Sequence, residues 1–225
     1  AWLMKLMPFR FEDAFSDDHI KYWELCWSVL LRIRIQQKLY RSGVWPVNQA
    51  DEEQWLRDRN CWIDHKEMVR LLILGRGMAK SSSIEAGAVM RACLLGAGYC
   101  LYVCESQDQA EEHLGNIREL IEHDDSLILE YYPHMEVDPN AKVNGKKTKD
   151  RTDLFITKGG FIGRAKGLNA NLRGLRIGGF RPDQITLDDI DGVNDSYAVS
   201  LKKFKQITAT VIGTQARRWT TIEPA

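Results

Sequence analysis

The feature that most constrains the fold is a short apolar run that ends in a glycine turn and continues into an expected helix. Leu71-Leu72-Ile73-Leu74 is followed by Gly75-Arg76-Gly77-Met78-Ala79-Lys80-Ser81-Ser82, and an alanine-rich amphipathic stretch occupies residues 84–95. A turn of this kind gathers backbone N–H groups at a helix N-terminus, where the helix dipole favours a bound anion. The segment therefore predicts a phosphate-binding loop between a buried strand and a helix.

In such a loop, Lys80 would reach the terminal phosphates of ATP and the Ser81 hydroxyl would ligate Mg²⁺. The strict motif has glycine at the two positions where this chain has Leu74 and Ala79. The alternative is a glycine-rich strand-to-helix turn with a solvated lysine. The expected nucleotide-binding set is Gly75, Arg76, Gly77, Met78, Ala79, Lys80, Ser81 and Ser82.

A second short run, residues 184–187, is β-prone and ends in the acidic pair Asp188 and Asp189. In phosphate-loop NTPases a buried strand delivers one carboxylate to Mg²⁺, and an adjacent carboxylate polarises the attacking water. Asp188 fits the metal role and Asp189 the role of the base. The alternative is a strand that ends in an ordinary acidic turn. Both motifs occur in one chain, with a separation in sequence that fits a single domain. Each therefore supports the nucleotide-binding interpretation of the other.

Composition limits the class of protein. The 225 residues suffice for one good core, and Lys+Arg and Asp+Glu both number 31. A net charge of zero argues against a surface coated with basic residues for nucleic acid, but it leaves room for a local basic track. Two basic groups stand out: Lys142, Lys146, Lys147, Lys149 and Arg151, then Arg164, Lys166, Arg173, Arg176 and Arg181. The alternative for the first group is a solvated loop.

Nothing in the sequence predicts a membrane span or secretion. The longest nearly uncharged apolar stretch, residues 92–104, is too short to cross a bilayer and contains two glycines. No leader with basic, apolar and small-residue regions opens the chain. The five cysteines lack metal-binding spacing, which favours reduced, buried thiols in the cytoplasm.

The first 67 residues are expected to form an N-terminal helical segment that packs on a core spanning residues 68–225. A helix is predicted over residues 19–40 and a shorter one over 52–58. The apolar face expected for the long helix contains Ile20, Trp23, Trp27, Leu30, Leu31 and Ile35. Its tryptophans are expected in the core, and the alternative is an aromatic contact with adenine.

From residue 68 the pattern alternates between strands and helices, which predicts an α/β fold with a mostly parallel sheet. The expected strands cover residues 69–74, 99–105, 154–156, 161–164, 185–188 and 208–214. The expected helices cover residues 82–95, 107–123 and 197–207. Residues 124–152 are expected to be an irregular loop or insertion, and Gly159-Gly160 a hairpin turn.

The order of four segments resembles a known family. They are Gly75 to Ser81, residues 101–110, Leu172-Arg173-Gly174-Leu175-Arg176, and Arg181-Pro182-Asp183 leading to Leu187-Asp188-Asp189. Together they resemble the ATPase domain of the large terminase subunit of tailed bacteriophages, over residues 68–214. The resemblance implies a P-loop NTPase of the ASCE, RecA-like type, with Lys80 on phosphate, Ser81 and Asp188 on Mg²⁺, and Asp189 as the catalytic carboxylate. Asp191 is a weaker candidate for the last role.

The resemblance also implies an arginine that stabilises the charge on the departing γ-phosphoryl group, an effect worth ~10³–10⁵ in rate. We expect Arg173 to act in trans on a neighbouring subunit's site and Arg76 to sense the γ-phosphate in cis, with Arg176 left open. Coupling of hydrolysis to movement is expected at Thr208 and Thr210, or at Thr214. The alternative for these threonines is a simple β-propensity role.

Further implications of the resemblance concern partners. Family members translocate double-stranded DNA into the procapsid in the cytoplasm of the infected bacterial host. They act with a portal protein and a small terminase subunit, as a homo-oligomeric ring that is usually a pentamer. A C-terminal nuclease domain is expected to be absent from these 225 residues, so no nuclease residue is assigned. Two other functions are weighed: a superfamily 2 helicase-like ATPase core, and a non-catalytic nucleotide-binding docking module.

Overall fold

The centre of the molecule is a five-stranded sheet with the strand order β4-β5-β1-β6-β7. The computed structural model describes residues 2–11, 15–46, 48, 51–69, 79–148, 151–170, 172, 175–192, 194–211, 215–216 and 218–224. The strands are β4 (Leu154–Ile156), β5 (Phe161–Gly167), β1 (Gly98–Cys104), β6 (Gln184–Leu187) and β7 (Thr221–Pro224). All neighbouring pairs are parallel except β4 with β5, so the predicted α/β fold with a mostly parallel sheet is confirmed.

Strand β1 is buried on both faces, as its continuous apolar sequence requires in a parallel sheet. Leu101 and Val103 contribute to one apolar cluster, whereas Tyr102 and Cys104 contribute to the other. All five cysteines are buried, as predicted. Burial, together with the charges of Asp188 and nearby acids, raises the pKa of Cys104 to about 12.

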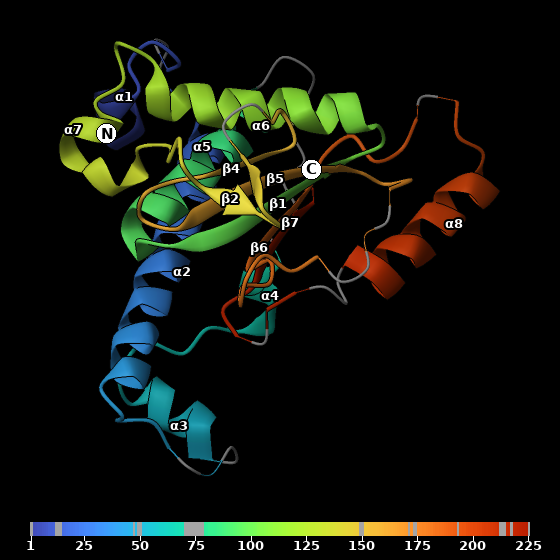
Figure 1. The fold of residues 1–225 in the computed structure, drawn as a ribbon. Helices are drawn as coiled ribbons and strands as arrows, with labels where there is room; N and C mark the ends of the chain where they lie inside the picture. The colour runs from blue at the N-terminus through green and yellow to red at the C-terminus, as the bar shows by residue number, and fades with distance from the viewer. Residues whose placement is uncertain are drawn as a thin grey trace.

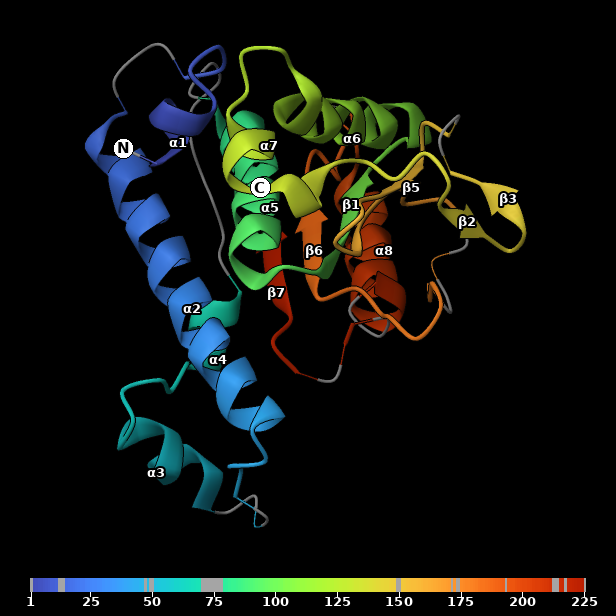
Figure 2. The same ribbon diagram turned by 60° about the vertical axis from the view of Figure 1, so that its left-hand side comes forward.

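Helices α5 (Lys80–Leu95) and α6 (Gln107–Glu122) cover one face of the sheet (Figures 1 and 2). Helix α2 (Asp17–Arg41) packs along α5, and α1 (Trp2–Leu6) joins the same apolar cluster. Helix α8 (Tyr197–Gln206) continues into a π-helical turn, η3 (Ile207–Val211), which packs against the second cluster. Helices α2 and α6 and strand β6 therefore begin and end within about two residues of the bounds predicted from the sequence.

The remaining elements are short. They are α3 (Glu52–Arg57), α4 (His65–Met68), α7 (Ile128–Tyr131), the 3₁₀ turn η2 (Pro133–Met135), and the hairpin of β2 (Lys142–Val143) and β3 (Lys146–Lys147). The stretch expected to be an irregular insertion thus contains a helix, a turn and a hairpin. No described helix has both the length and the apolar character needed to cross a bilayer.

The predicted buried face of α2 is wrong at most positions. Of its six residues only Leu30 is buried, Trp23 and Trp27 are half-buried, and Ile20, Leu31 and Ile35 are exposed. The buried apolar residues of α2 are the following: Tyr22, Cys26, Val29, Leu30 and Ile33. Apolar residues surround most of this helix, so their spacing alone does not select one face.

The predicted last strand, residues 208–214, is also wrong over the residues that the structure describes. Thr208 lies in η3, where its hydroxyl donates to the backbone carbonyls of the preceding helical turn. Thr210 does the same toward Gln206. Threonine favours strands, but here these residues continue α8 as a helical turn. The last strand of the sheet is β7 instead. Residues 212–214 lie outside the described part of the chain.

The predicted strand at residues 69–74 lies outside the described residues except for Val69. Val69 forms a parallel bridge with Ile222 of β7. Strand β7 therefore lies between the acidic strand β6 and the residue that leads into the predicted phosphate loop.

The position of α4, which precedes that loop, is held by Arg32 of α2. The Arg32 guanidinium contacts both carboxylate oxygens of Glu67, at 2.6 and 3.0 Å, and also donates to the Trp62 carbonyl. The hydrogen bond from Arg32 lowers the pKa of Glu67. Both side chains are at most 30% exposed, so this pair is better shielded from solvent than a typical surface ion pair.

We expect Glu67→Gln to lower the free energy of unfolding by about 1 kcal/mol at pH 7, because the bidentate charged contact is lost. Since the folded pKa lies below the unfolded value of about 4.3, this contribution is present above that pH and is lost as the pH falls through the folded pKa. Urea unfolding at pH 7 and pH 3 measures it. The matched control is Glu53→Gln, whose Arg57 partner is half-exposed. A loss in Glu67→Gln no larger than in that control would contradict the assignment.

Gly167, at the end of β5, allows a close approach of the sheet to α6. A Cβ atom there would lie 2.6 Å from the backbone nitrogen of Gln107, whereas one at Gly115 of α6 would meet nothing within 4 Å. We therefore expect Gly167→Ala to destabilise the fold by about 1–3 kcal/mol through overpacking. Gly115→Ala should stabilise it by about 0.5–1 kcal/mol. Thermal unfolding of the two variants checks both signs, and equal shifts would contradict the packing argument.

Candidate active site

The structure brings together three residues that the sequence predicted for one site. Lys80 is the first residue of α5, and Asp188 directly follows β6. The Lys80 Nζ atom lies 3.2 Å from Oδ1 of Asp188 and 3.5 Å from Oδ1 of Asp189, which is 109 positions away in the chain. Three charged groups from the two separate motifs therefore meet at one edge of the sheet.

Asp188 is a fully buried carboxylate. The Tyr102 hydroxyl donates a hydrogen bond of 2.9 Å to Oδ2, whereas no hydrogen bond of good geometry from a described residue reaches the buried Oδ1. Burial acts to raise the pKa of Asp188, but the Ser81 and Tyr102 side chains and the Lys80 charge outweigh burial and lower it. The group is therefore an anion at neutral pH.

Asp189 has a different environment from its neighbour. Its side chain is 63% exposed, and its backbone is in the left-handed region, with a φ of 46°. The Glu105 N–H donates to the Asp189 carbonyl at 3.2 Å and so anchors this turn. Left-handed backbone is uncommon outside glycine, and such strain is often found at functional sites. An exposed carboxylate beside a buried one suits a group that contacts water.

The end of the predicted loop has the same backbone feature. Ala79, which caps α5, has a φ of 49°, and the Ser83 N–H bonds to its carbonyl at 2.9 Å. Ala79 stands where the strict motif has glycine. The backbone therefore has the conformation that glycine adopts most easily, although the sequence has a residue with a Cβ atom.

The residues present fit a magnesium ion. Mg²⁺ prefers hard oxygen ligands, and in nucleotide sites it is held by one or two protein groups together with phosphates and waters. Asp188 and Ser81 are such groups, and Oδ1 of Asp188, which faces Lys80 Nζ and accepts no hydrogen bond of good geometry from a described residue, suits a ligand position. The described residues contain no cluster of three or more His, Cys, Asp or Glu side chains that could hold a metal alone.

Lys80 is suited to contact phosphate. Burial acts to lower its pKa, but the charges of Asp188 and Asp189 outweigh burial and raise it. The side chain is therefore a stable ammonium group, one quarter exposed, at the N-terminus of α5.

Several predicted site residues lie outside the described part of the chain. They are Gly75, Arg76, Gly77, Met78, Arg173 and Thr214. Their assignments stay predictions. Ser82 is described, and its hydroxyl accepts a hydrogen bond of 3.2 Å from Arg10.

Sequence reasoning missed a group of polar residues beside Asp188. Glu85 of α5 is fully buried and receives hydrogen bonds from Arg10 at 3.1 Å and from Asn116 at 2.9 Å. His113 of α6 lies between the acids: its Nδ1 is 2.7 Å from Glu85, and its Nε2 is 3.8 Å from Oδ2 of Asp188. The available signal was Glu85 itself, the one acid within the alanine-rich stretch of α5.

The environment of His113 favours its charged form. Burial acts to lower the pKa of His113, but the hydrogen bond to Glu85 and the charges of Glu85 and Asp188 raise it by more. Its ring stacks on that of Tyr102, with centroids 4.9 Å apart and an interplanar angle of 20°.

A lysine of α8 connects that helix to the turn after the acidic pair. Lys203 Nζ lies 2.7 Å from Glu105 and 2.5 Å from Asp195, and it donates to the Ile190 carbonyl at 3.0 Å. The loop after Asp189 is thereby tied to α8 by the Lys203 side chain, and the coupling role of Thr208, Thr210 or Thr214 stays a prediction.

Some residues of the predicted basic track form ion pairs or hydrogen bonds with other residues of the chain. Arg151 pairs with Asp153 at 2.8 Å, and Lys166 lies 3.6 Å from the same residue. Arg164 donates to the Tyr99 hydroxyl. By contrast, Lys142, Lys146 and Lys147 are exposed on the β2–β3 hairpin, so this hairpin carries the freer positive charge.

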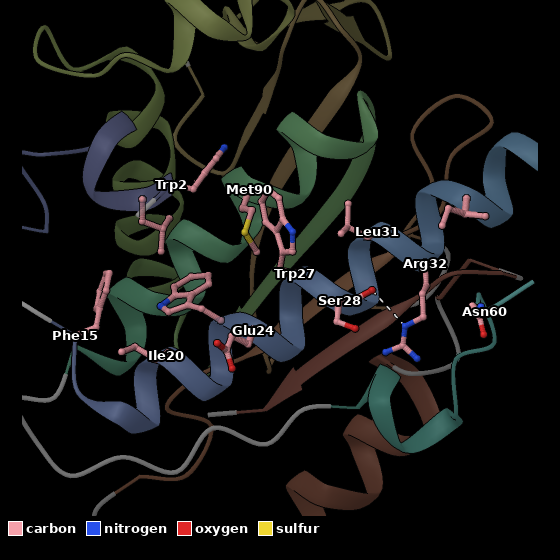
Figure 3. Close-up of a pocket in the computed structure, with 13 residues that line it drawn as sticks. Trp2, Phe15, Ile20, Glu24, Trp27, Ser28, Leu31, Arg32, Asn60 and Met90 are labelled. Carbon is pink, nitrogen blue, oxygen red and sulfur yellow. Dashed lines mark hydrogen bonds between the residues drawn. The ribbon is translucent and has the colours of Figure 1, made fainter.

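A separate apolar groove of about 670 Å³ runs along α2 (Figure 3). Trp2, Trp27 and Met90 line it, and Arg32 at its edge donates to the Ser28 carbonyl. None of the residues that line it is Lys80, Ser81, Asp188 or Asp189. The two tryptophans predicted for the core, Trp23 and Trp27, therefore pack partly on the core and partly line this groove.

No family's sequence profile matches the chain, and no curated protein does. Among solved structures, the chain is similar to an arginine-to-alanine mutant of the large terminase ATPase domain of Thermus phage P74-26. The two are 17% identical with a TM-score of 0.40, and the match covers 70% of this chain and 59% of that one. At this identity and TM-score the similarity does not bear on activity, substrates or partners.

Proposed function

We propose that this chain is a Mg²⁺-dependent ATPase, and that it is the motor domain of a large terminase that drives double-stranded viral DNA into a procapsid. The single observation that supports the ATPase best is the contact of Lys80 with the buried Asp188. A cation at a helix N-terminus beside a buried carboxylate at the end of a parallel strand is the arrangement that phosphate-loop NTPases require.

Each residue has a role in this proposal. Lys80 and the N-terminus of α5 bind the β- and γ-phosphates, and Ser81 and Asp188 hold the metal. Asp189, exposed beside them, orients the attacking water. The bound Mg²⁺ would neutralise charge that develops on the phosphate oxygens.

The proposed assembly, partners and arginine roles rest on the sequence resemblance. In it the active form is a homo-oligomeric ring on a portal protein, usually a pentamer, with a small terminase subunit delivering the DNA. Arg173 completes the neighbouring subunit's site, and Arg76 senses the γ-phosphate in cis. Because the chain has no net charge, one subunit would bind DNA weakly and with strong salt dependence, and the ring would add avidity.

Two other functions remain to be separated from this one. A superfamily 2 helicase-like core would separate the strands of a forked duplex, whereas a terminase motor would translocate without unwinding. A non-catalytic docking module would bind ATP without turnover. The presence of Lys80, Ser81, Asp188 and Asp189 together favours hydrolysis over docking alone.

We expect Lys80→Ala to abolish MgATP hydrolysis, because the cation that contacts phosphate is lost. The measurement is the rate of phosphate release at several protein concentrations for both chains. A rate that rises more than linearly with native protein indicates completion of the site by a neighbour. The matched control is Lys158→Ala, whose side chain pairs with Glu136 and is half-exposed. Equal rates for Lys80→Ala and Lys158→Ala would contradict the site.

For Arg173→Ala we expect loss of turnover by ~10³-fold or more, with ATP affinity nearly retained, because a trans-acting arginine acts on the transition state. Mixing this variant with Asp189→Asn protein should restore part of the rate, since each supplies what the other lacks. An unaltered rate in Arg173→Ala would remove this residue from the role.

A further inference from the structure

We propose that Tyr102 and His113 form a clamp that orients the Asp188 carboxylate for Mg²⁺, an inference that rests on the proposed ATPase function. Both act as positioning residues through Asp188. The clamp has three parts: the Tyr102 hydroxyl on Oδ2, the His113 ring stacked on Tyr102, and Glu85 holding His113.

The geometry assigns a distinct task to each oxygen of Asp188. Oδ2 receives the Tyr102 hydroxyl at 2.9 Å and faces His113 Nε2 at 3.8 Å. Oδ1 faces Lys80 and has no other hydrogen bond of good geometry from a described residue. A carboxylate fixed through one oxygen presents the other in a single direction, which is what a metal with strict octahedral geometry requires.

The clamp is itself held in place. His113 Nδ1 contacts Glu85, which is fully buried and also accepts hydrogen bonds from Arg10 and Asn116. A buried carboxylate with three partners keeps one position because any other would leave it unpaired. The histidine ring therefore cannot rotate freely, and through the stacked Tyr102 ring its orientation reaches Asp188.

Outer partners of this kind typically affect metal affinity by about 10–100-fold when they are removed. The probe is a fluorescent ADP analogue, whose affinity is measured once with Mg²⁺ and once with EDTA. The ratio of the two affinities reports the metal's share of binding and does not require turnover. Lost packing would lower both affinities, whereas a misoriented Asp188 lowers only the Mg²⁺-dependent one.

The variants are Tyr102→Phe, which keeps the ring stack and removes the hydroxyl, and His113→Gln, which keeps a polar contact to Glu85. The matched control is His123→Gln, at the far end of α6, where the ring stacks on Phe9. We expect the Mg²⁺-dependent gain to fall by about 10-fold or more in both clamp variants, with the EDTA affinity unchanged. His123→Gln should match the native chain.

A second readout uses the protein without nucleotide. Urea unfolding of His113→Gln, Asp188→Asn and the double variant should be non-additive, because both substitutions remove the same contact. Additive losses, or a Mg²⁺-dependent gain that survives in both clamp variants, overturn the inference while leaving the ATPase intact. A native chain that binds the analogue no better than Lys80→Ala does overturns the proposed function, and the inference with it.

Discussion

The structure depends on one buried carboxylate. Asp188 is fully buried at the end of β6, and a buried charge is costly unless it is paired and hydrogen-bonded. Its compensation comes from three elements: Lys80 on α5, Tyr102 on β1 and His113 on α6. None of these partners is near Asp188 in the sequence, so the sheet and both covering helices must be assembled before the charge is stabilised. Compensation of the Asp188 charge therefore depends on the packing of the sheet against α5 and α6.

The same constraint extends to the N-terminal segment. Arg10 reaches Glu85 and Ser82 at the start of α5, and Arg32 of α2 holds Glu67 just before the predicted phosphate loop. These contacts lie on either side of the predicted phosphate loop in the sequence. Arg10 therefore contacts the polar group beside Asp188, and Arg32 contacts the helix that precedes the predicted loop.

The sequence predicted the parts of the site that local chemistry defines. Lys80 and Ser81 open a helix, and Asp188 ends a β-prone run, so their positions follow from short motifs. The parts that depend on packing were missed. The buried face of α2 could not be chosen because apolar residues surround it, and residues 208–211 continue α8 despite their threonines. His113 has no motif, and only its contacts with Glu85 and Asp188 reveal it.

Residues with strained backbone flank both members of the Lys80–Asp188 ion pair. Ala79 precedes Lys80 and Asp189 follows Asp188, and both adopt left-handed backbone that costs a residue with a Cβ atom roughly 1–3 kcal/mol. Each is fixed by a hydrogen bond to its carbonyl, from Ser83 N–H and Glu105 N–H. Glu105 also binds Lys203 of α8, so the strained turn at Asp189 is tied to a helix whose own side chains are largely exposed. The Asp189 turn is therefore connected to α8 by two contacts, the hydrogen bond from the Glu105 N–H and the ion pair of Glu105 with Lys203.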